Sequence, residues 1–278
     1  MSGALKVGVC SWSLQVSSLP ELERLLDRVG IRVVQLALGD PNHATWEEGD
    51  AIVERALGAS FEITGTMVGF PGEDYTSPET IKRTGGFGEA AQRAERLEIF
   101  RWGVERTATL GVGLITTHAG FIPEPDDPGR ASFLDCLGSA ASMAAERGIV
   151  LALETGQETA GLLRRTLDDL KSSSLKVNFD PANMILYDKG DPIEAIAILA
   201  PDIAHVHAKD ARYPDRAGEW GEEVALGEGE VGMDAFLEAL RKAGYNGPLA
   251  IEREVGDQEE RVRDIAAGAR LLEELIGR

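Results

Sequence analysis

The sequence predicts a single (β/α)8 TIM barrel that occupies residues 1–278. Eight short apolar segments recur along the chain, and helical patterns lie between them. Alternation of strand and helix indicates a parallel sheet, and eight such units in a chain of this length are typical of a closed barrel. The alternative is a doubly wound open sheet, which usually has a glycine-rich phosphate loop after its first strand. Here the corresponding segment, SWSLQVSSLP, contains no glycine.

The predicted strands are apolar runs, several of them rich in β-branched residues and bounded by Gly, Pro, Asp or Asn. In chain order they are LKVGVCSW (5–12), IRVVQLAL (31–38), FEITGTMV (61–68), VGLITTHAG (112–120), GIVLALET (148–155), LKVNFD (175–180), IAHVHAKD (203–210) and PLAIERE (248–254). In a parallel barrel the carboxyl ends of all these strands meet at one mouth.

The intervals show helical periodicity. Apolar residues recur at three- and four-residue steps in three sets, which are Leu19, Leu22, Leu26 and Val29, then Phe133, Leu137, Ala140 and Ala144, and finally Phe236, Leu237 and Leu240. Segment 89–110 is rich in Ala, Glu and Arg and is apolar along one stripe. Gly30, Gly111, Gly148 and Gly244 stand where a helix should end before the next strand. The irregular segment 69–88 follows the third strand, so we expect it to form a lid or substrate loop at the mouth.

The charge and composition narrow the class of partner. The formal net charge is −19, and a surface of that charge repels nucleic acid and anionic membranes, so we expect a small-molecule partner. No apolar run approaches the roughly 20 residues that a membrane span needs, and the N-terminal residues lack a signal-peptide pattern. We therefore expect a cytoplasmic location. Cys10 and Cys136 fit no disulfide or zinc spacing, so we expect buried thiols.

Metal-binding residue types occur at the ends of successive strands. Glu154, Asp180 and His207 end the fifth, sixth and seventh strands, and Glu252 lies in the eighth. Strand alternation points all four side chains inward, together with Glu254. Clustered carboxylates at a barrel mouth would repel one another, and one divalent cation would remove that cost. Carboxylate oxygens with one imidazole suit Mn²⁺, Mg²⁺ or Co²⁺. The alternative is that each residue is an ordinary turn residue.

The motifs LALET, NFDPANM, HVHAKD, LGEGEV and IERE, in this order, resemble those of the xylose isomerase-like barrel superfamily. That superfamily includes sugar-phosphate isomerase/epimerase proteins, ketose 3-epimerases, inosose dehydratases and family-two AP endonucleases, and the resemblance spans essentially the whole chain. It implies a metal site formed by Glu154, Asp180, His207 and Glu252. It also implies that Glu154 and Glu252 transfer protons in a sugar or keto-sugar isomerase or epimerase that acts through a metal-stabilised enediolate. Relatives are often dimers or tetramers, so a homo-oligomer stays open.

One departure from the epimerases keeps other reactions open. They place a histidine that contacts the substrate three residues after the aspartate, where this chain has Asn183. A lyase acting on a keto-polyol, such as an inosose dehydratase, is therefore the main alternative. A non-catalytic sugar-binding barrel is another. An AP endonuclease is disfavoured because those enzymes use additional histidines, whereas this acidic chain has four.

The substrate contacts are predicted less specifically than the metal ligands. Besides Asn183, the candidates are His118, Lys209, Arg212 and Trp12. Lys209 and Arg212 follow His207, where relatives often place a basic residue. Trp12 is read as an apolar wall for the sugar or as barrel packing. His205 is read as a packed histidine one layer below His207, and His43 as a solvated loop residue. LGEGEV lacks a following Lys-Ser/Thr, so it is not expected to cradle a phosphate.

Overall fold

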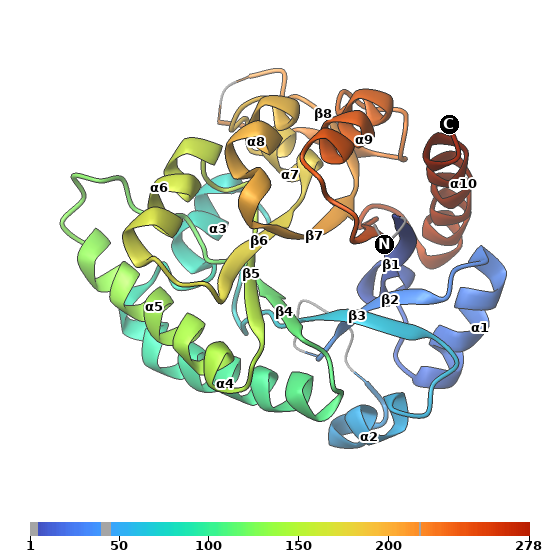
Figure 1. The fold of residues 1–278 in the computed structure, drawn as a ribbon, viewed down its shortest axis with the longest axis horizontal. Coiled ribbons are helices and arrows are strands. Elements are labelled where there is room, and N and C mark those ends of the chain that lie inside the picture. The colour runs from blue at the N-terminus through green and yellow to red at the C-terminus, as the bar shows by residue number, and fades with distance from the viewer. Residues whose placement is uncertain (1–4, 40–45, 217) are drawn as a thin grey trace.

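The computed structural model describes residues 5–39, 46–216 and 218–278. Parallel strands close into a barrel in the order β1-β10-β7-β6-β5-β4-β3-β2, and helices surround it (Figure 1). The barrel strands are β1 (Lys6–Cys10), β2 (Val33–Ala37), β3 (Glu62–Met67), β4 (Leu114–Thr117), β5 (Val150–Glu154), β6 (Leu175–Phe179), β7 (Ile203–Ala208) and β10 (Pro248–Ile251). The predicted (β/α)8 barrel is confirmed, and each barrel strand falls inside its predicted segment.

The helices fill the intervals as the periodicity predicts. They are α1 (Leu19–Val29), α2 (Ile52–Ala56), α3 (Pro78–Thr84), α4 (Arg93–Thr109), α5 (Arg130–Glu146), α6 (Ala160–Leu170), α7 (Pro181–Leu186), α8 (Pro192–Leu199), α9 (Met233–Lys242) and α10 (Gln258–Ile276). Gly30 and Gly244 follow α1 and α9 with φ of 74° and 76°, a conformation that glycine adopts without strain. Helices α1 and α10 lie side by side (Figure 1) and join early and late parts of the chain.

The core lies between the strands and the helices, and its packing fixes which side chains face the barrel axis. Phe179 of β6 is fully buried and stacks on Phe236 of α9, with 6.2 Å between ring centroids. Phe179 therefore points outward. Its neighbours Asn178 and Asp180 point inward, because side chains alternate along a strand. The same alternation directs Glu154 and His207 toward the axis.

Two features differ from the sequence-based expectation. Segment 69–88 is not irregular throughout, because it contains α3, which Ser77 caps in a reciprocal capping box with Thr80. The segment is also held together internally, since Glu73 accepts hydrogen bonds from the backbone N–H groups of Phe70 and Gly86. It is joined to the residues after β4 by the backbone N–H of Phe87, which donates to the carbonyl of Ala119 at 2.7 Å. A small antiparallel sheet, β8 (Asp210–Arg212) with β9 (Glu222–Val224), was not predicted. Its strands are too short to produce a clear alternating pattern.

Within the described residues, no helix has both the length and the apolar character needed to cross a bilayer. Cys10 and Cys136 are free and buried, as expected.

Candidate metal centre and substrate cavity

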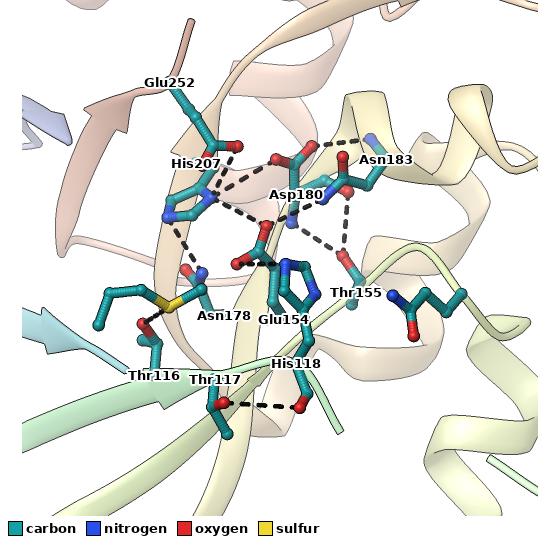
Figure 2. Close-up of polar contacts among 12 residues, drawn as sticks. Thr116, Thr117, His118, Glu154, Thr155, Asn178, Asp180, Asn183, His207 and Glu252 are labelled. Carbon is teal, nitrogen blue, oxygen red and sulfur yellow. Dashed lines mark hydrogen bonds and ion pairs between the residues drawn. The ribbon is translucent and has the colours of Figure 1, made fainter. Parts of the chain in front are cut away.

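The four side chains predicted as ligands converge at the barrel mouth from β5, the end of β6, β7 and the end of β10 (Figure 2). His207 Nδ1 lies 3.4 Å from each of three carboxylate oxygens, Glu154 Oε1, Asp180 Oδ2 and Glu252 Oε2. One ligand atom from each of the four residues lies within 4.8 Å of all the others. Two ligands bound at about 2.1 Å to one ion lie roughly 3.0–3.4 Å apart for angles of 90–109°. The spacing therefore fits a shared cation.

Asp180 is held at the end of β6 by hydrogen bonds on both sides. Its backbone N–H donates to Thr155 Oγ1 at 2.8 Å, and its carbonyl oxygen accepts from the same hydroxyl at 2.9 Å. Its Oδ1 accepts from the backbone N–H of Asn183 at 2.8 Å and so caps α7. These contacts leave Oδ2 directed at the cluster. Burial raises the pKa of this carboxyl to about 6.

The partners of His207 decide which ring nitrogen faces the cluster. Nε2 has two neighbours, Gln35 Oε1 at 2.7 Å and Asn178 Nδ2 at 3.1 Å. The shorter contact, with Gln35, is favourable when Nε2 carries the hydrogen. Gln35 is oriented in turn by its amide nitrogen, which donates to Thr116 Oγ1 at 2.8 Å. Nδ1 therefore faces the three carboxylates without a hydrogen of its own. A neutral imidazole in this form is a metal ligand.

The carboxylates also change the protonation of His207. Burial opposes a charged ring, but the charges of Glu252 and Glu154 and the contact with Asp180 outweigh it and hold the pKa of His207 well above its usual range. A proton on Nδ1 and a cation bound to Nδ1 are thus two ways to offset the same negative charge.

The two glutamates have different surroundings. Glu252 accepts from Trp12 Nε1 at 2.8 Å and from Lys209 Nζ at 2.9 Å. Burial would raise its pKa, but Lys209 and His207 lower it well below the usual range. Glu154 accepts from Asn183 Nδ2 at 2.9 Å, and the Nε2 of His118 lies 3.6 Å from its other oxygen. Burial also opposes ionisation of Glu154, and His118 and His207 outweigh it, so its pKa is lowered.

The unsatisfied atoms of the cluster test whether a cation fits. Glu154 Oε2, Asp180 Oδ2 and His207 Nδ1 are buried and have no hydrogen-bond partner among the described residues. Buried polar atoms are normally paired, so a bound ion would account for all three. Three carboxylates and one imidazole suit a hard divalent cation. Cys10 also lies close to His207 and Glu252. Burial raises the pKa of its thiol to about 12, so it stays protonated and is disfavoured as a ligand.

A cavity of about 420 Å³ opens beside this cluster. Its lining residues are Met67, Tyr75, His118, Glu154, Asn183, Leu186, Tyr187, Lys209, Trp220, Gly221, Glu223, Glu252, Glu254 and Val255. Three of the predicted substrate contacts, His118, Asn183 and Lys209, therefore line the cavity. Tyr75 is the one residue of segment 69–88 that lines the cavity in the described part of the chain.

The other two predicted contacts lie elsewhere. Trp12 is buried behind Glu252 and packs edge-on against the His207 ring, 5.9 Å between centroids, so it supports the cluster and does not line the cavity. Arg212 is exposed in β8, where it pairs with Glu222 at 3.0 Å and donates to the carbonyl of Glu228.

His205 does not line the cavity. His205 is buried one layer below His207 and contacts Asn178 Oδ1 at 2.9 Å, and burial lowers its pKa to about 3. His43 lies outside the described residues.

Sequence reasoning missed several residues of the site. Gln35 offers a weak signal, as an amide in the apolar run VVQLAL. Tyr75, Tyr187 and Trp220 lie on turns and loops without a periodic pattern, so only the folded chain brings them together.

Comparisons with known proteins agree with the fold. The model of the family described as xylose isomerase-like TIM barrel matches residues 11–275. A crystal structure of a xylose isomerase domain protein from Planctomyces limnophilus superposes with a TM-score of 0.86, at 33% identity over 99% of this chain and 98% of that one.

Two curated relatives are similar over part of their length. An uncharacterized protein of Methanocaldococcus jannaschii is 27% identical over 195 residues, which is 65% of this chain and 62% of that protein. The L-ribulose-5-phosphate 3-epimerase UlaE of Salmonella typhi is 27% identical over 173 residues, 60% of this chain and 59% of the epimerase. The chain thus spans about three fifths of these curated relatives.

Proposed function

The chain belongs to the xylose isomerase-like TIM barrel family, and from that premise we propose that it is a divalent-metal-dependent isomerase or epimerase of a sugar or keto-sugar. The observation that carries the proposal is the buried cluster of Glu154, Asp180, His207 and Glu252, whose ligand atoms lie within 4.8 Å of one another beside the cavity. The similarity to a curated sugar epimerase supports the substrate class.

Each residue has a proposed role. Glu154, Asp180, His207 and Glu252 would hold one Mn²⁺, Mg²⁺ or Co²⁺ ion, and Gln35 and Trp12 would orient two of these ligands. When bound, such an ion supplies a Lewis acid that polarises a carbonyl and acidifies the neighbouring C–H group. Glu154 and Glu252 are the proton-transfer groups: one carboxylate removes the proton from the carbon beside the carbonyl, and a carboxyl group returns it. His118 and Asn183 donate hydrogen bonds to substrate hydroxyls.

Solvent exchange tests the proton transfer directly. The metal-loaded protein is incubated in D₂O with a panel of ketoses and inososes, and NMR follows the proton on the carbon beside each carbonyl. We expect this proton to be replaced by deuterium in at least one substrate. We expect no exchange with the double variant Glu154→Gln and Glu252→Gln, and unchanged exchange with the control Glu228→Gln, whose side chain is exposed and outside the site.

The same spectra distinguish an isomerase or epimerase from the two alternatives, a dehydratase and a non-catalytic sugar-binding barrel. A product of unchanged formula means isomerisation or epimerisation, whereas loss of water means that the base expelled a leaving group, as in a dehydratase. Binding of a sugar by a metal-loaded protein that exchanges no proton across the panel would contradict the enzymatic proposal and favour a sugar-binding barrel.

A further inference from the structure

The charge of the substrate cavity is strongly one-sided. Four carboxylates line it, those of Glu154, Glu223, Glu252 and Glu254. Within the described residues, Lys209 is the one lysine or arginine on the lining. A phosphate ester carries a charge near −2 at neutral pH, so it would need an available cation or a set of free backbone N–H groups.

Lys209 has no hydrogen-bonding capacity left for a phosphate. Its side chain is 2% exposed. An ammonium has three N–H donors, and three acceptors surround this one: Glu252 Oε2 at 2.9 Å, Glu254 Oε2 at 2.6 Å and Asn183 Oδ1 at 3.4 Å. A carboxylate of Glu223 lies 3.7 Å away as well. Lys209 therefore neutralises protein carboxylates.

The arginines near the rim are engaged in the same way. Arg253 pairs with Glu223 at 2.7 Å and with Asp264 at 2.9 Å. Arg261 donates to the backbone carbonyls of Glu254 and Gly256. Each of these guanidinium groups thus already has an acceptor within the chain.

The glycine-containing loop 226–231 does not offer its backbone either. The carboxylate of Asp210 accepts from the backbone N–H groups of Gly227, Gly229 and Val231, at 2.9, 3.1 and 3.1 Å. Such a ring of N–H groups is a common anion-binding cradle. Here a carboxylate of the protein itself fills it.

The rest of the cavity wall suits an uncharged carbon skeleton. Tyr187 and Trp220 meet edge to face with 4.5 Å between ring centroids, and Met67 and Leu186 line the same cavity. Aromatic and aliphatic groups can pack against the C–H face of a polyol, while the carboxylates accept hydrogen bonds from its hydroxyls.

We propose that this site takes an uncharged ketose or keto-polyol and discriminates against its phosphate esters, an inference that rests on the proposed function. The protein would thereby differ from its relative that is named as a ribulose-phosphate epimerase. A competing anchor is Lys189, which lies 6.0 Å from the Phe121 ring centroid and lines a separate cavity of about 170 Å³ that shares Tyr187 with the substrate cavity.

The test compares free ketopentoses and ketohexoses with their terminal phosphate esters. The metal-loaded protein is assayed by deuterium exchange for kcat/KM and by calorimetry for Kd, with the free metal concentration held constant because phosphates bind divalent ions. At low salt we expect kcat/KM for each active ketose to exceed kcat/KM for its phosphate ester on the order of 100-fold. The reason is that bringing like charges together at a binding site is strongly unfavourable. Added NaCl should narrow the difference by screening.

A charge introduced at the rim provides the matched variant. Val255 is half exposed and lines the cavity. We expect Val255→Lys to raise the ester-to-ketose ratio of kcat/KM by about tenfold or more, and Val255→Met, of similar length without charge, to leave the ratio unchanged.

Two results would overturn the inference in distinguishable ways. An ester that equals or exceeds its free ketose overturns the substrate class while the proposed function stands. Loss of such a preference in Lys189→Met would then identify Lys189 as the anchor. If no member of any pair exchanges its proton, the proposed function fails and the inference falls with it.

Discussion

The Nε2 nitrogen of His207 lies 2.7 Å from the Oε1 oxygen of Gln35, on the opposite side of the ring from the three carboxylates. The contact joins β7 to β2, two strands that do not pair, across the barrel interior. Both side chains are buried, at 0% and 1% exposure. An uncharged residue on a distant strand thus orients the imidazole that we propose as a metal ligand.

We predict that Gln35→Leu weakens Mn²⁺ binding by roughly 10–100-fold, the usual effect of removing a hydrogen bond that orients a metal-binding histidine. Calorimetric titration with Mn²⁺ measures the Kd of each variant. Gln35→Glu keeps an acceptor for Nε2–H and should retain tighter binding than Gln35→Leu. Circular dichroism of the metal-free variants controls for folding. Folded Gln35→Leu that binds Mn²⁺ as tightly as the parent protein would show that Gln35 has no part in orienting the ligand.

Removing Lys209 should destabilise the metal-free protein. Lys209 is buried among Glu252, Glu254 and Glu223, and deleting one partner of a buried ion pair leaves an uncompensated charge. We expect Lys209→Met to lower the free energy of unfolding by on the order of 3 kcal/mol, measured by urea denaturation. Lys242→Met removes an exposed pair with Glu238 and should change it by less than about 0.5 kcal/mol. Equal effects of the two substitutions would contradict the assignment.

The convergence of the four proposed metal ligands could be predicted from the sequence because a simple periodicity places them. Glu154, Asp180 and His207 end consecutive parallel strands, and the alternation of side chains fixes the face on which each lies. Their convergence follows from barrel closure alone. The helix ends at Gly30 and Gly244 were predictable for a similar local reason, since each needs a positive φ.

The cavity could not be predicted in the same way. Lys209 was expected to be available to a substrate, but the structure surrounds it with Glu223 and Glu254, and Glu223 comes from the unpredicted strand β9. Arg212, three residues further along, turns outward. These outcomes depend on which loops meet in space, and no local pattern in the sequence encodes that meeting.

Metal removal should lower thermal stability. The three buried carboxylates of Glu154, Asp180 and Glu252 repel one another, and a ligand that binds only the folded state adds RT ln(1 + [L]/Kd) to its stability. We expect Mn²⁺ at 100 times its Kd to add about 2.7 kcal/mol, seen as a rise in Tm over the EDTA-treated protein. Asp180→Asn removes one ligand charge and should reduce this rise, whereas Glu228→Gln should not. An identical Tm with Mn²⁺ and with EDTA would contradict a cation site.

Glu158 is a buried carboxyl outside the cluster, in the segment between β5 and α6. Burial raises its pKa from 4.5 to about 8, and the nearby charge of Lys189 only partly offsets this. Between these two pH values the folded protein holds a proton that the unfolded chain releases. The contribution of Glu158 to stability is therefore fully present below pH 4.5 and is lost as the pH rises through about 8.

Glu158→Gln replaces this carboxyl with a neutral group of the same shape. We expect the variant and the parent protein to have similar unfolding free energies near pH 5, where Glu158 is protonated in the folded state. Above the folded pKa the variant should be more stable by on the order of 4–5 kcal/mol, since each of the roughly 3.5 pKa units corresponds to about 1.4 kcal/mol. Urea denaturation from pH 5 to 9 measures the difference, and Glu228→Gln, at an exposed site, should show none. If the difference in unfolding free energy between Glu158→Gln and the parent protein does not change with pH, Glu158 is ionised throughout this range. The raised pKa would then be contradicted.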